Sequence, residues 1–216
     1  MMKFVIKYGL IIILVASGCS KWSTTEDLSH ESQLPVFTLE GEEFMAFEPI
    51  DSGEFKDPGV TALANGKELT VYTFGEPDMT KVGVYVIIYY AKNADGLANT
   101  SKRVIAVRDI DVTNNDLSGT YSGTWWSPQV EMKVKKIDPK GYYKVGEVLG
   151  YPGSDMPGNF VDMGNNDLVL VNGEGDFGRY EASEGTYTRS SLNWTISLID
   201  SPYDGVEVPV IWHKEK

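Results

Sequence analysis

The 216-residue sequence predicts an all-β protein made of two antiparallel modules. From Pro35 onward, short runs rich in β-branched and aromatic residues alternate with Gly, Pro, Asn and Asp, which is typical of strands joined by turns. No segment shows the apolar period of a helix. The polar, acidic stretch at residues 108–116 divides these runs into two groups, and we place the domain boundary there.

A basic and then apolar segment opens the chain. Lys3 and Lys7 are followed by an apolar run at residues 9–15 and by small residues at 16–18, directly before Cys19. These are the marks of an export signal, and the arrangement resembles a bacterial lipoprotein signal. The resemblance implies that residues 1–18 are a signal peptide and that Cys19, acylated by a lipid such as palmitate, becomes the first mature residue. An ordinary signal peptide cut nearby and an uncleaved anchor are the alternatives.

The charge of the mature chain argues against several partners. Residues 1–18 contain two lysines and no acid, so their removal changes the formal net charge from -12 to -14. A surface this acidic repels nucleic acid and anionic lipid headgroups. We therefore expect no nucleic-acid partner, and we expect the protein to attach to the membrane through its acyl chains alone. Cys19 is the single cysteine, which leaves no disulfide, and the polar residues 19–34 predict a flexible tether.

The first module, residues 35–110, contains five predicted strands. They lie at residues 36–39, 43–47, 69–74, 84–91 and 102–107. The run VYVIIYYA at 84–91 is apolar on both faces, as expected for a central strand covered on one side and partly on the other. Its β-branched and aromatic residues disfavour a helix.

A succession of short motifs runs through this module. FKDPGVTA at 55–62 is followed by GVYV at 83–86, YYA at 89–91, NADG at 93–96 and RVIAV at 103–107. The succession resembles the bacterial immunoglobulin-like domain found in many surface lipoproteins and in some pesticidal crystal proteins. It covers residues 35–109 and implies an immunoglobulin-like β-sandwich that serves as a spacer or docking module. The turn residues at 57–59 and 93–96 agree with that fold.

The second module, residues 116–216, opens with LSGTYSGTWW, in which small and aromatic residues interleave. Further strands are predicted at residues 130–137, 142–149, 168–171, 185–188, 192–198 and 206–212. Their spacing suits an antiparallel meander that closes as a small barrel or sandwich. Trp194 and Trp212 lie in regular alternation, which predicts that both belong to the core.

The order of lipid signal, tether, immunoglobulin-like domain and Gly/Trp/Tyr-rich β-module resembles accessory lipoproteins encoded beside starch-utilisation-type TonB-dependent transporters. It implies a lipid-anchored protein of the outer membrane that faces the cell exterior and captures or docks an oligosaccharide or peptide in a transporter complex. Glu26 and Asp27, close to Cys19, agree with the acidic export signal of such lipoproteins. The alternative is a structural spacer or adhesin-like surface protein without a small-molecule ligand.

Candidate ligand-binding residues are aromatic or carry a carboxamide or carboxylate. An exposed ring can stack on the apolar face of a sugar while a neighbouring Asn or Asp binds its hydroxyls. Two adjacent tryptophans in a predicted strand point to opposite faces, so one of them is either exposed or packed at a sheet edge or domain contact. Residues 151–166 predict a long loop, which is either functional or a mobile excursion. The candidates are Trp125, Trp126, Tyr151, Asn159 and Asp162.

The sequence contains few residues suited to catalysis or metal binding. His30 lies in the tether, which leaves His213 as the other imidazole, and no G-x-S-x-G motif is present. The acidic and amide residues at 155–167 lack the EF-hand order, and the Gly-rich residues 173–178 predict a turn. We therefore expect that the protein is not an enzyme and has neither a metal site nor a cofactor. A glycan-degrading enzyme, which needs two carboxylates, is the third functional class.

Overall fold

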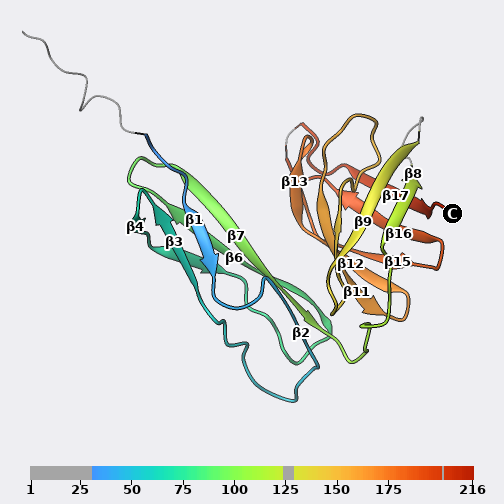
Figure 1. Cartoon of the computed structure of the whole chain (residues 1–216), viewed down its shortest axis with the longest axis horizontal. Helices are drawn as coiled ribbons and strands as arrows, with labels where there is room; N and C mark the ends of the chain where they lie inside the picture. The colour runs from blue at the N-terminus through green and yellow to red at the C-terminus, as the bar shows by residue number, and fades with distance from the viewer. Residues whose placement is uncertain (1–30, 124–128, 201) are drawn as a thin grey trace, which may run out of the picture. The chain divides into compact units, whose positions relative to one another are not determined.

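The computed structural model describes residues 31–123, 129–200 and 202–216, which form strands and turns and no helix. The all-β prediction is confirmed. Within these ranges there is accordingly no helix of the length and apolarity needed to cross a membrane. Residues Gln33–Lys216 form one compact unit, in which a two-sheet sandwich precedes a closed barrel (Figure 1).

The sandwich pairs a three-stranded sheet, in the order β1-β3-β4, with a four-stranded sheet, in the order β2-β7-β6-β5. Strand β2 runs parallel to β7, and the other pairs are antiparallel. The strands are β1 (Val36–Leu39), β2 (Phe44–Phe47), β3 (Val60–Ala64), β4 (Lys67–Glu68), β5 (Val71–Phe74), β6 (Gly83–Lys92) and β7 (Ala98–Val107). Ile87, Tyr89, Ile105 and Val107 belong to the core of this sandwich.

The β3–β4 hairpin has no counterpart among the predicted strands. The strand predicted at 69–74 starts at Val71, and the residues before it pair with β3 instead. The turn of this hairpin is Asn65-Gly66, with φ of 51° and 72°. Asn-Gly with positive φ at both positions is typical of a type I′ hairpin turn, so the signal was present in the sequence.

Arg103 on β7 ties the loops of the sandwich to its core. Its buried guanidinium donates from Nη2 to the carbonyls of Glu40 (2.8 Å) and Gly59 (3.0 Å), and from Nε to the Tyr89 hydroxyl (3.0 Å). That hydroxyl donates to Asp57 Oδ2 at 2.7 Å, and burial raises the pKa of Tyr89 to about 12. The predicted turn at 57–59 is therefore fixed from inside the sandwich.

The chain enters the sandwich beside the turn between β6 and β7. Asn93 Nδ2 donates to the Gln33 carbonyl at 2.7 Å, and Asn99 Nδ2 donates to the Pro35 carbonyl at 2.9 Å. Asn93 Oδ1 also accepts from the Leu97 amide at 2.8 Å, which closes the predicted turn. The entry point thus lies at the first residues of β7, the opposite end of that strand from Val107.

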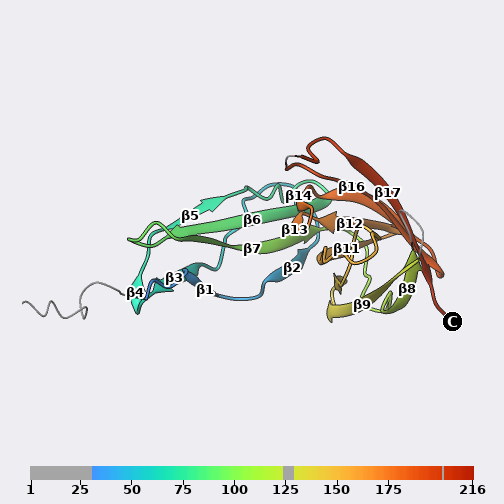
Figure 2. The ribbon, with the colours of Figure 1, turned by 90° about the horizontal axis from the view of Figure 1, so that it is seen from above.

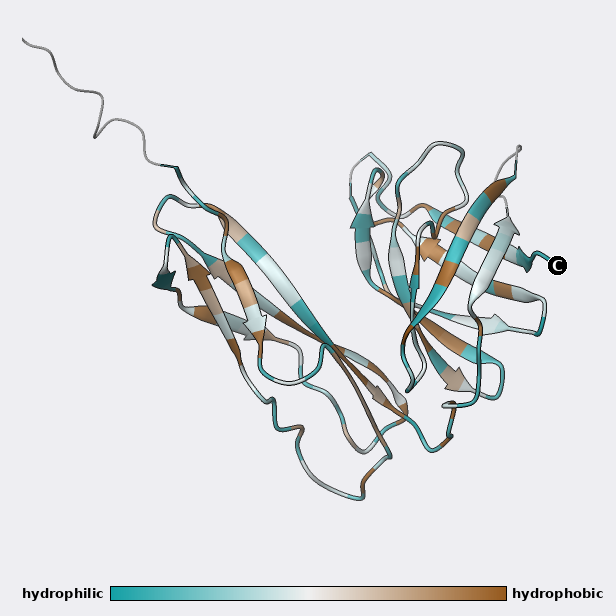
Figure 3. Ribbon diagram, viewed as in Figure 1, coloured by the Kyte–Doolittle hydropathy of each residue, from teal (hydrophilic) through white to brown (hydrophobic). Residues whose placement is uncertain are grey.

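The second module is a closed barrel of eight antiparallel strands. Of the two predicted closures, barrel or sandwich, the barrel is therefore correct. The strands follow one another around the barrel in chain order, with a two-stranded hairpin inserted between β12 and β15. They are β8 (Gly119–Gly123), β9 (Val130–Asp138), β10 (Tyr142–Val145), β11 (Gly158–Gly164), β12 (Asp167–Val171), β15 (Ser183–Tyr187), β16 (Ser191–Ser197) and β17 (Glu207–Lys214), with the hairpin β13 (Gly173–Gly175) and β14 (Gly178–Tyr180). Alternating hydrophilic and hydrophobic residues along β9 are visible in Figure 3.

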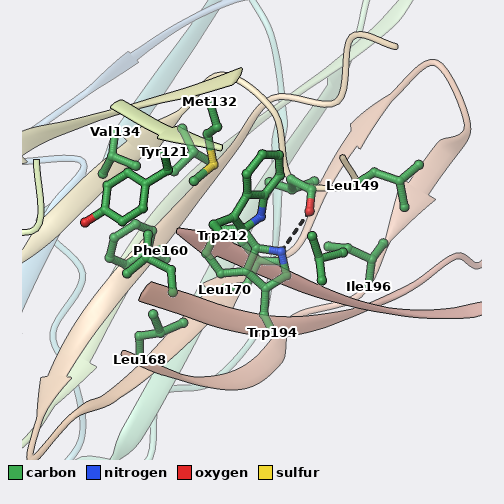
Figure 4. Close-up of a cluster of buried hydrophobic side chains, with 14 of the residues drawn as sticks. Tyr121, Met132, Val134, Leu149, Phe160, Leu168, Leu170, Trp194, Ile196 and Trp212 are labelled. Atoms are coloured by element: carbon green, nitrogen blue, oxygen red, sulfur yellow. Dashed lines mark hydrogen bonds between the residues drawn. The ribbon is translucent and has the colours of Figure 1, made fainter. Parts of the chain in front are cut away.

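Side chains fill the barrel interior (Figure 4). Trp194 and Trp212, predicted to be core residues, are 3% and 0% exposed, and their rings lie 6.3 Å apart. Trp194 Nε1 donates to the Val148 carbonyl at 2.8 Å. A Cβ on Gly123 would come within 2.6 Å of the Trp212 ring, so glycine is needed there. Eight strands enclose about the space that side chains fill, and a ligand is therefore to be sought outside the barrel.

The prediction of a long loop over residues 151–166 is wrong for the second half of that range. Residues Gly158–Gly164 are strand β11, and the loop ends before it. Phe160 belongs to the barrel core, whereas Val161 and Met163 pack against the sandwich. Both faces of β11 are therefore buried, and the glycines and polar residues between its apolar side chains obscured the strand pattern.

The sandwich and the barrel share an apolar cluster, called the interdomain cluster below. The rings of Phe44 on β2 and Tyr142 on β10 stack with centroids 4.7 Å apart and an interplanar angle of 10°. The interdomain cluster comprises Phe44, Val104, Ala106, Tyr142, Val161, Met163 and Val171, with Val84 and Val86 packed against it. This second contact explains why the 84–91 strand is apolar on both faces.

The segment between the modules is bound to the barrel. Arg108 donates from Nη1 to the Asp162 carbonyl at 2.8 Å and from Nη2 to the Lys140 carbonyl. Lys136 Nζ donates to the carbonyls of Thr113 (2.9 Å) and Asn115 (2.6 Å). The acidic connection at 108–116 is thus a strap, and its polar groups find partners on the barrel.

Truncating the Phe44 ring tests how much the interdomain cluster contributes to stability. Phe44→Ala should lower the free energy of unfolding by about 3 kcal/mol, because it removes a buried aromatic side chain. Phe74→Ala, the same change on an exposed residue of the same sheet, should cost less than about 0.5 kcal/mol. Urea denaturation of both variants measures this, and equal losses would contradict the assignment.

Candidate ligand-binding site

Three aromatic rings meet at one end of the barrel, and we call them the aromatic triad. Phe177 lies between Tyr151 and Tyr203, with ring centroids 5.3 Å and 5.2 Å away in edge-to-face contacts. The three come from the connections β10–β11, β13–β14 and β16–β17, which lie together at the top of the barrel in Figure 1. Tyr151 is 40% and Tyr203 38% exposed, so the triad presents ring surface to solvent.

The β13–β14 hairpin that carries Phe177 is pinned to the neighbouring loop. The Asp155 amide donates to Asp176 Oδ2 at 2.9 Å, and the Asp176 amide donates to the Asp155 carbonyl at 3.0 Å. A Cβ on Gly175 would lie 2.4 Å from that same carbonyl, so the close approach requires glycine. The turn predicted at 173–178 is confirmed as a hairpin.

A buried carboxylate organises the loop that carries Tyr151. Glu147 Oε1 accepts from the amides of Leu149 (2.8 Å) and Gly150 (3.1 Å), and Oε2 accepts from the Ser154 hydroxyl (3.0 Å) and the Met156 amide (3.3 Å). Burial raises the pKa of the Glu147 carboxyl, and these hydrogen bonds oppose that shift. One side chain therefore satisfies the polar groups of a loop that lacks a strand partner.

An ion pair fixes the connection that carries Tyr203. Arg179 Nη2 lies 2.8 Å from Asp200 Oδ1, and the Arg179 amide donates to Asp200 Oδ2 at 2.7 Å. These hydrogen bonds lower the pKa of Asp200, which stays ionised beside the aromatic triad. Exposed rings flanked by carboxylates can stack on the apolar face of a sugar and accept hydrogen bonds from its hydroxyls.

Of the residues predicted from the sequence, Tyr151 belongs to the triad. Asn159 lies on β11, where its Nδ2 donates to the Tyr143 carbonyl at 3.3 Å. Asp162 is 0% exposed; its Oδ1 accepts from Gly164 and the Tyr187 hydroxyl, and its Oδ2 accepts from Asn115. Asp162 therefore belongs to the hydrogen-bond network around the strap and does not join Tyr151. Trp125 and Trp126 lie outside the described residues.

Phe177 and Tyr203 were missed as candidates. Both sit in turn segments between strands, GEGDFG and SPYDG, where an aromatic residue among Gly, Asp and Pro has no place in a strand core. That pattern was a usable signal for a ring outside the strands; Tyr203 is exposed, whereas Phe177 is partly buried against the barrel core. Their meeting with Tyr151 depends on barrel closure, which no local pattern shows.

Removing the Glu147 carboxylate should loosen the loop of Tyr151. In Glu147→Ala, three amides lose their acceptor, so hydrogen exchange at Leu149, Gly150 and Met156 should quicken about tenfold or more, since a hydrogen bond to a charged group contributes about 1.5–3 kcal/mol. Glu207→Ala, at an exposed position on β17, is the matched control. Unchanged exchange at these three amides would show that the carboxylate does not hold the loop.

Comparison with known proteins concerns mainly the sandwich. Residues 37–107 match the family model described as a bacterial surface protein, Ig-like domain. No curated protein matches the sequence. Among solved structures, this chain is similar to a lipoprotein from Bacteroides thetaiotaomicron, with 23% sequence identity and a TM-score of 0.37. The alignment covers 84% of this chain and 100% of the lipoprotein chain. The match of residues 37–107 to the family model confirms the predicted immunoglobulin-like sandwich.

Proposed function

We propose that this protein is a lipid-anchored, non-catalytic surface protein that captures an oligosaccharide at the aromatic triad. The observation that carries the proposal is the convergence of Tyr151, Phe177 and Tyr203 from three connections that are pinned to one another. Rings held in place by Glu147, the Asp155–Asp176 contact and the Arg179–Asp200 pair lose little conformational freedom on binding. Such preorganisation favours affinity because less conformational entropy is lost on binding.

The charge around the triad selects the class of ligand. Asp155, Asp176 and Asp200 all lie at this end of the barrel, and the chain as a whole is strongly acidic. Anionic ligands are repelled, whereas neutral hydroxyls donate to carboxylates. The filled barrel interior leaves the outer, exposed rings for contact. A neutral oligosaccharide therefore fits better than an acidic one, and a peptide is the other ligand class to test.

The anchor belongs to the same proposal. The sequence around Cys19 supports lipidation, and the match of residues 37–107 to a domain of bacterial surface proteins supports display at the cell exterior. Docking to a TonB-dependent outer-membrane transporter is proposed from the order of the sequence segments. A rigid spacer is the second candidate function, which the interdomain cluster and the strap favour because both hold the barrel firmly on the sandwich.

Binding to a glycan array tests capture at the triad. The full-length protein in mild detergent should bind a subset of neutral glycans, and the Tyr151→Ala/Phe177→Ala double variant should bind them about tenfold more weakly or worse, because two stacking surfaces are lost. Ile211→Ala, which removes an exposed apolar side chain from β17, is the control and should bind normally. Binding that is unchanged in the double variant would leave the spacer candidate.

Lipidation is tested by metabolic labelling with palmitate in a bacterial host. The wild-type chain should incorporate label, and Cys19→Ser should lose it and leave the membrane fraction, since no polybasic patch would retain so acidic a protein. Exposure to added protease on intact cells should then degrade the wild-type protein. Labelling that persists in Cys19→Ser would refute acylation at this residue.

A further inference from the structure

The outer face of the four-stranded sandwich sheet extends beyond the interdomain cluster. Directly paired residues share a face, so Val86 and Val104 form a row with Phe44, and these are covered. The next row along the strands is Phe74, Ile88 and Lys102, and the one after it is Tyr72, Tyr90 and Thr100. One continuous face therefore has a covered half and an open half.

The open half presents aromatic rings to solvent. Phe74 is 58% and Tyr72 55% exposed, and the Tyr72 and Tyr90 rings lie 6.3 Å apart. Large apolar side chains are expensive to leave in water, and their grouping on one face marks a binding surface more often than their scattering does. Tyr72 and Phe74 are two residues apart on β5, so their rings lie on the same face, side by side along the strand.

The β13–β14 hairpin bounds a groove at one edge of this open half, next to a separate hollow that Tyr72, Phe74 and Tyr90 line. A space of about 860 Å³ is lined by Ile88, Thr100 and Lys102 from the sheet and by Asn172, Glu174 and Arg179 from the hairpin side. Figure 2 shows the hairpin beside β6, in agreement with that lining. The size is within the range of pockets that hold small ligands.

One residue that lines this groove carries a buried acceptor without a partner among the described residues. Asn172 Oδ1 is buried and accepts no hydrogen bond from the described residues. The backbone carbonyl of the same residue accepts from Lys102 Nζ at 2.8 Å, so the ammonium is committed to the main chain. An unsatisfied buried acceptor is costly, and a donor brought by a ligand would satisfy it.

The remaining charges in the groove balance. Arg179 is held by Asp200, and the lining contains two cations, Lys102 and Arg179, and two acids, Glu174 and Glu181. Neither a strongly anionic nor a strongly cationic ligand is favoured by such a lining. Hydroxyl groups, which donate and accept, suit the mixture of Asn172, Thr100, Ser101 and the two glutamates.

We propose that this groove and the adjoining rings of Tyr72 and Phe74 together form a second carbohydrate site, in which a neutral oligosaccharide stacks sugar units on those two side chains and donates a hydroxyl to Asn172 Oδ1 in the groove. The site lies on different elements from the aromatic triad, apart from the shared β13–β14 hairpin, and it does not depend on the triad. A chain of several sugar units could contact either site alone.

Electrophoresis through native gels that contain dextran, mannan, xylan or mixed-linkage β-glucan tests the groove. The full-length protein in mild detergent should be retarded by at least one of these polysaccharides. Tyr72→Ala and Phe74→Ala should each reduce the retardation constant about tenfold. Thr73→Ala, between them on β5, pairs with the inward-facing Tyr89, lies on the opposite face and should migrate as wild type does.

Asn172→Ala separates a ligand contact from a structural role. It removes an acceptor that is unpaired without ligand, so the melting temperature should stay equal or rise while retardation falls. A lower melting temperature with unchanged retardation would show that Asn172 serves the fold and would remove it from the site.

The outcomes distinguish the two carbohydrate sites. Retardation lost in Tyr151→Ala/Phe177→Ala and kept in the β5 variants overturns the groove and leaves the triad. The reverse overturns the triad and leaves the groove. If no polysaccharide retards the protein, or if peptides from a tryptic casein digest are retained through Tyr72 and Phe74 instead, the carbohydrate assignment of the groove is refuted.

Discussion

The stacked rings of Phe44 and Tyr142 are the contact on which the arrangement of this molecule depends. They join a sandwich sheet to the outside of a barrel whose own interior is already full. Because the barrel covers one half of that sheet, the other half remains open beside the β13–β14 hairpin. The groove thus depends on this contact, since its lining comes from both modules.

The strap shows why a polar, acidic connection need not be flexible. Asp162 is buried with both carboxylate oxygens bonded, and Arg108 is buried with its guanidinium on backbone carbonyls. Burial lowers the pKa of Arg108, and the nearby acids Asp162 and Asp111 oppose that shift. Breaking either residue would leave polar groups without partners in a dry site, which is more damaging than a missing surface contact.

The sequence was sufficient where a local pattern determines structure. The apolar run at 84–91, the turns at 57–59 and 93–96 and the alternating tryptophans Trp194 and Trp212 all behave as their patterns predict. It was insufficient where burial comes from distant segments. Asp162 looked like a loop ligand because nothing local reveals Asn115 and Tyr187 around it. The triad likewise forms only when three connections converge on closing the barrel.

The entry of the chain beside Asn93 and Asn99 has a mechanical consequence. Gln33 and Pro35 are bound beside the start of β7, and the barrel is packed against Val104 and Ala106 near the other end of that strand. With the proposed lipid anchor and the proposed ligand, tension between the two would run lengthwise along β7 and load its hydrogen bonds to β6 in shear. Many bonds must then yield together, and the sandwich resists flow better than a hairpin pulled apart from one end.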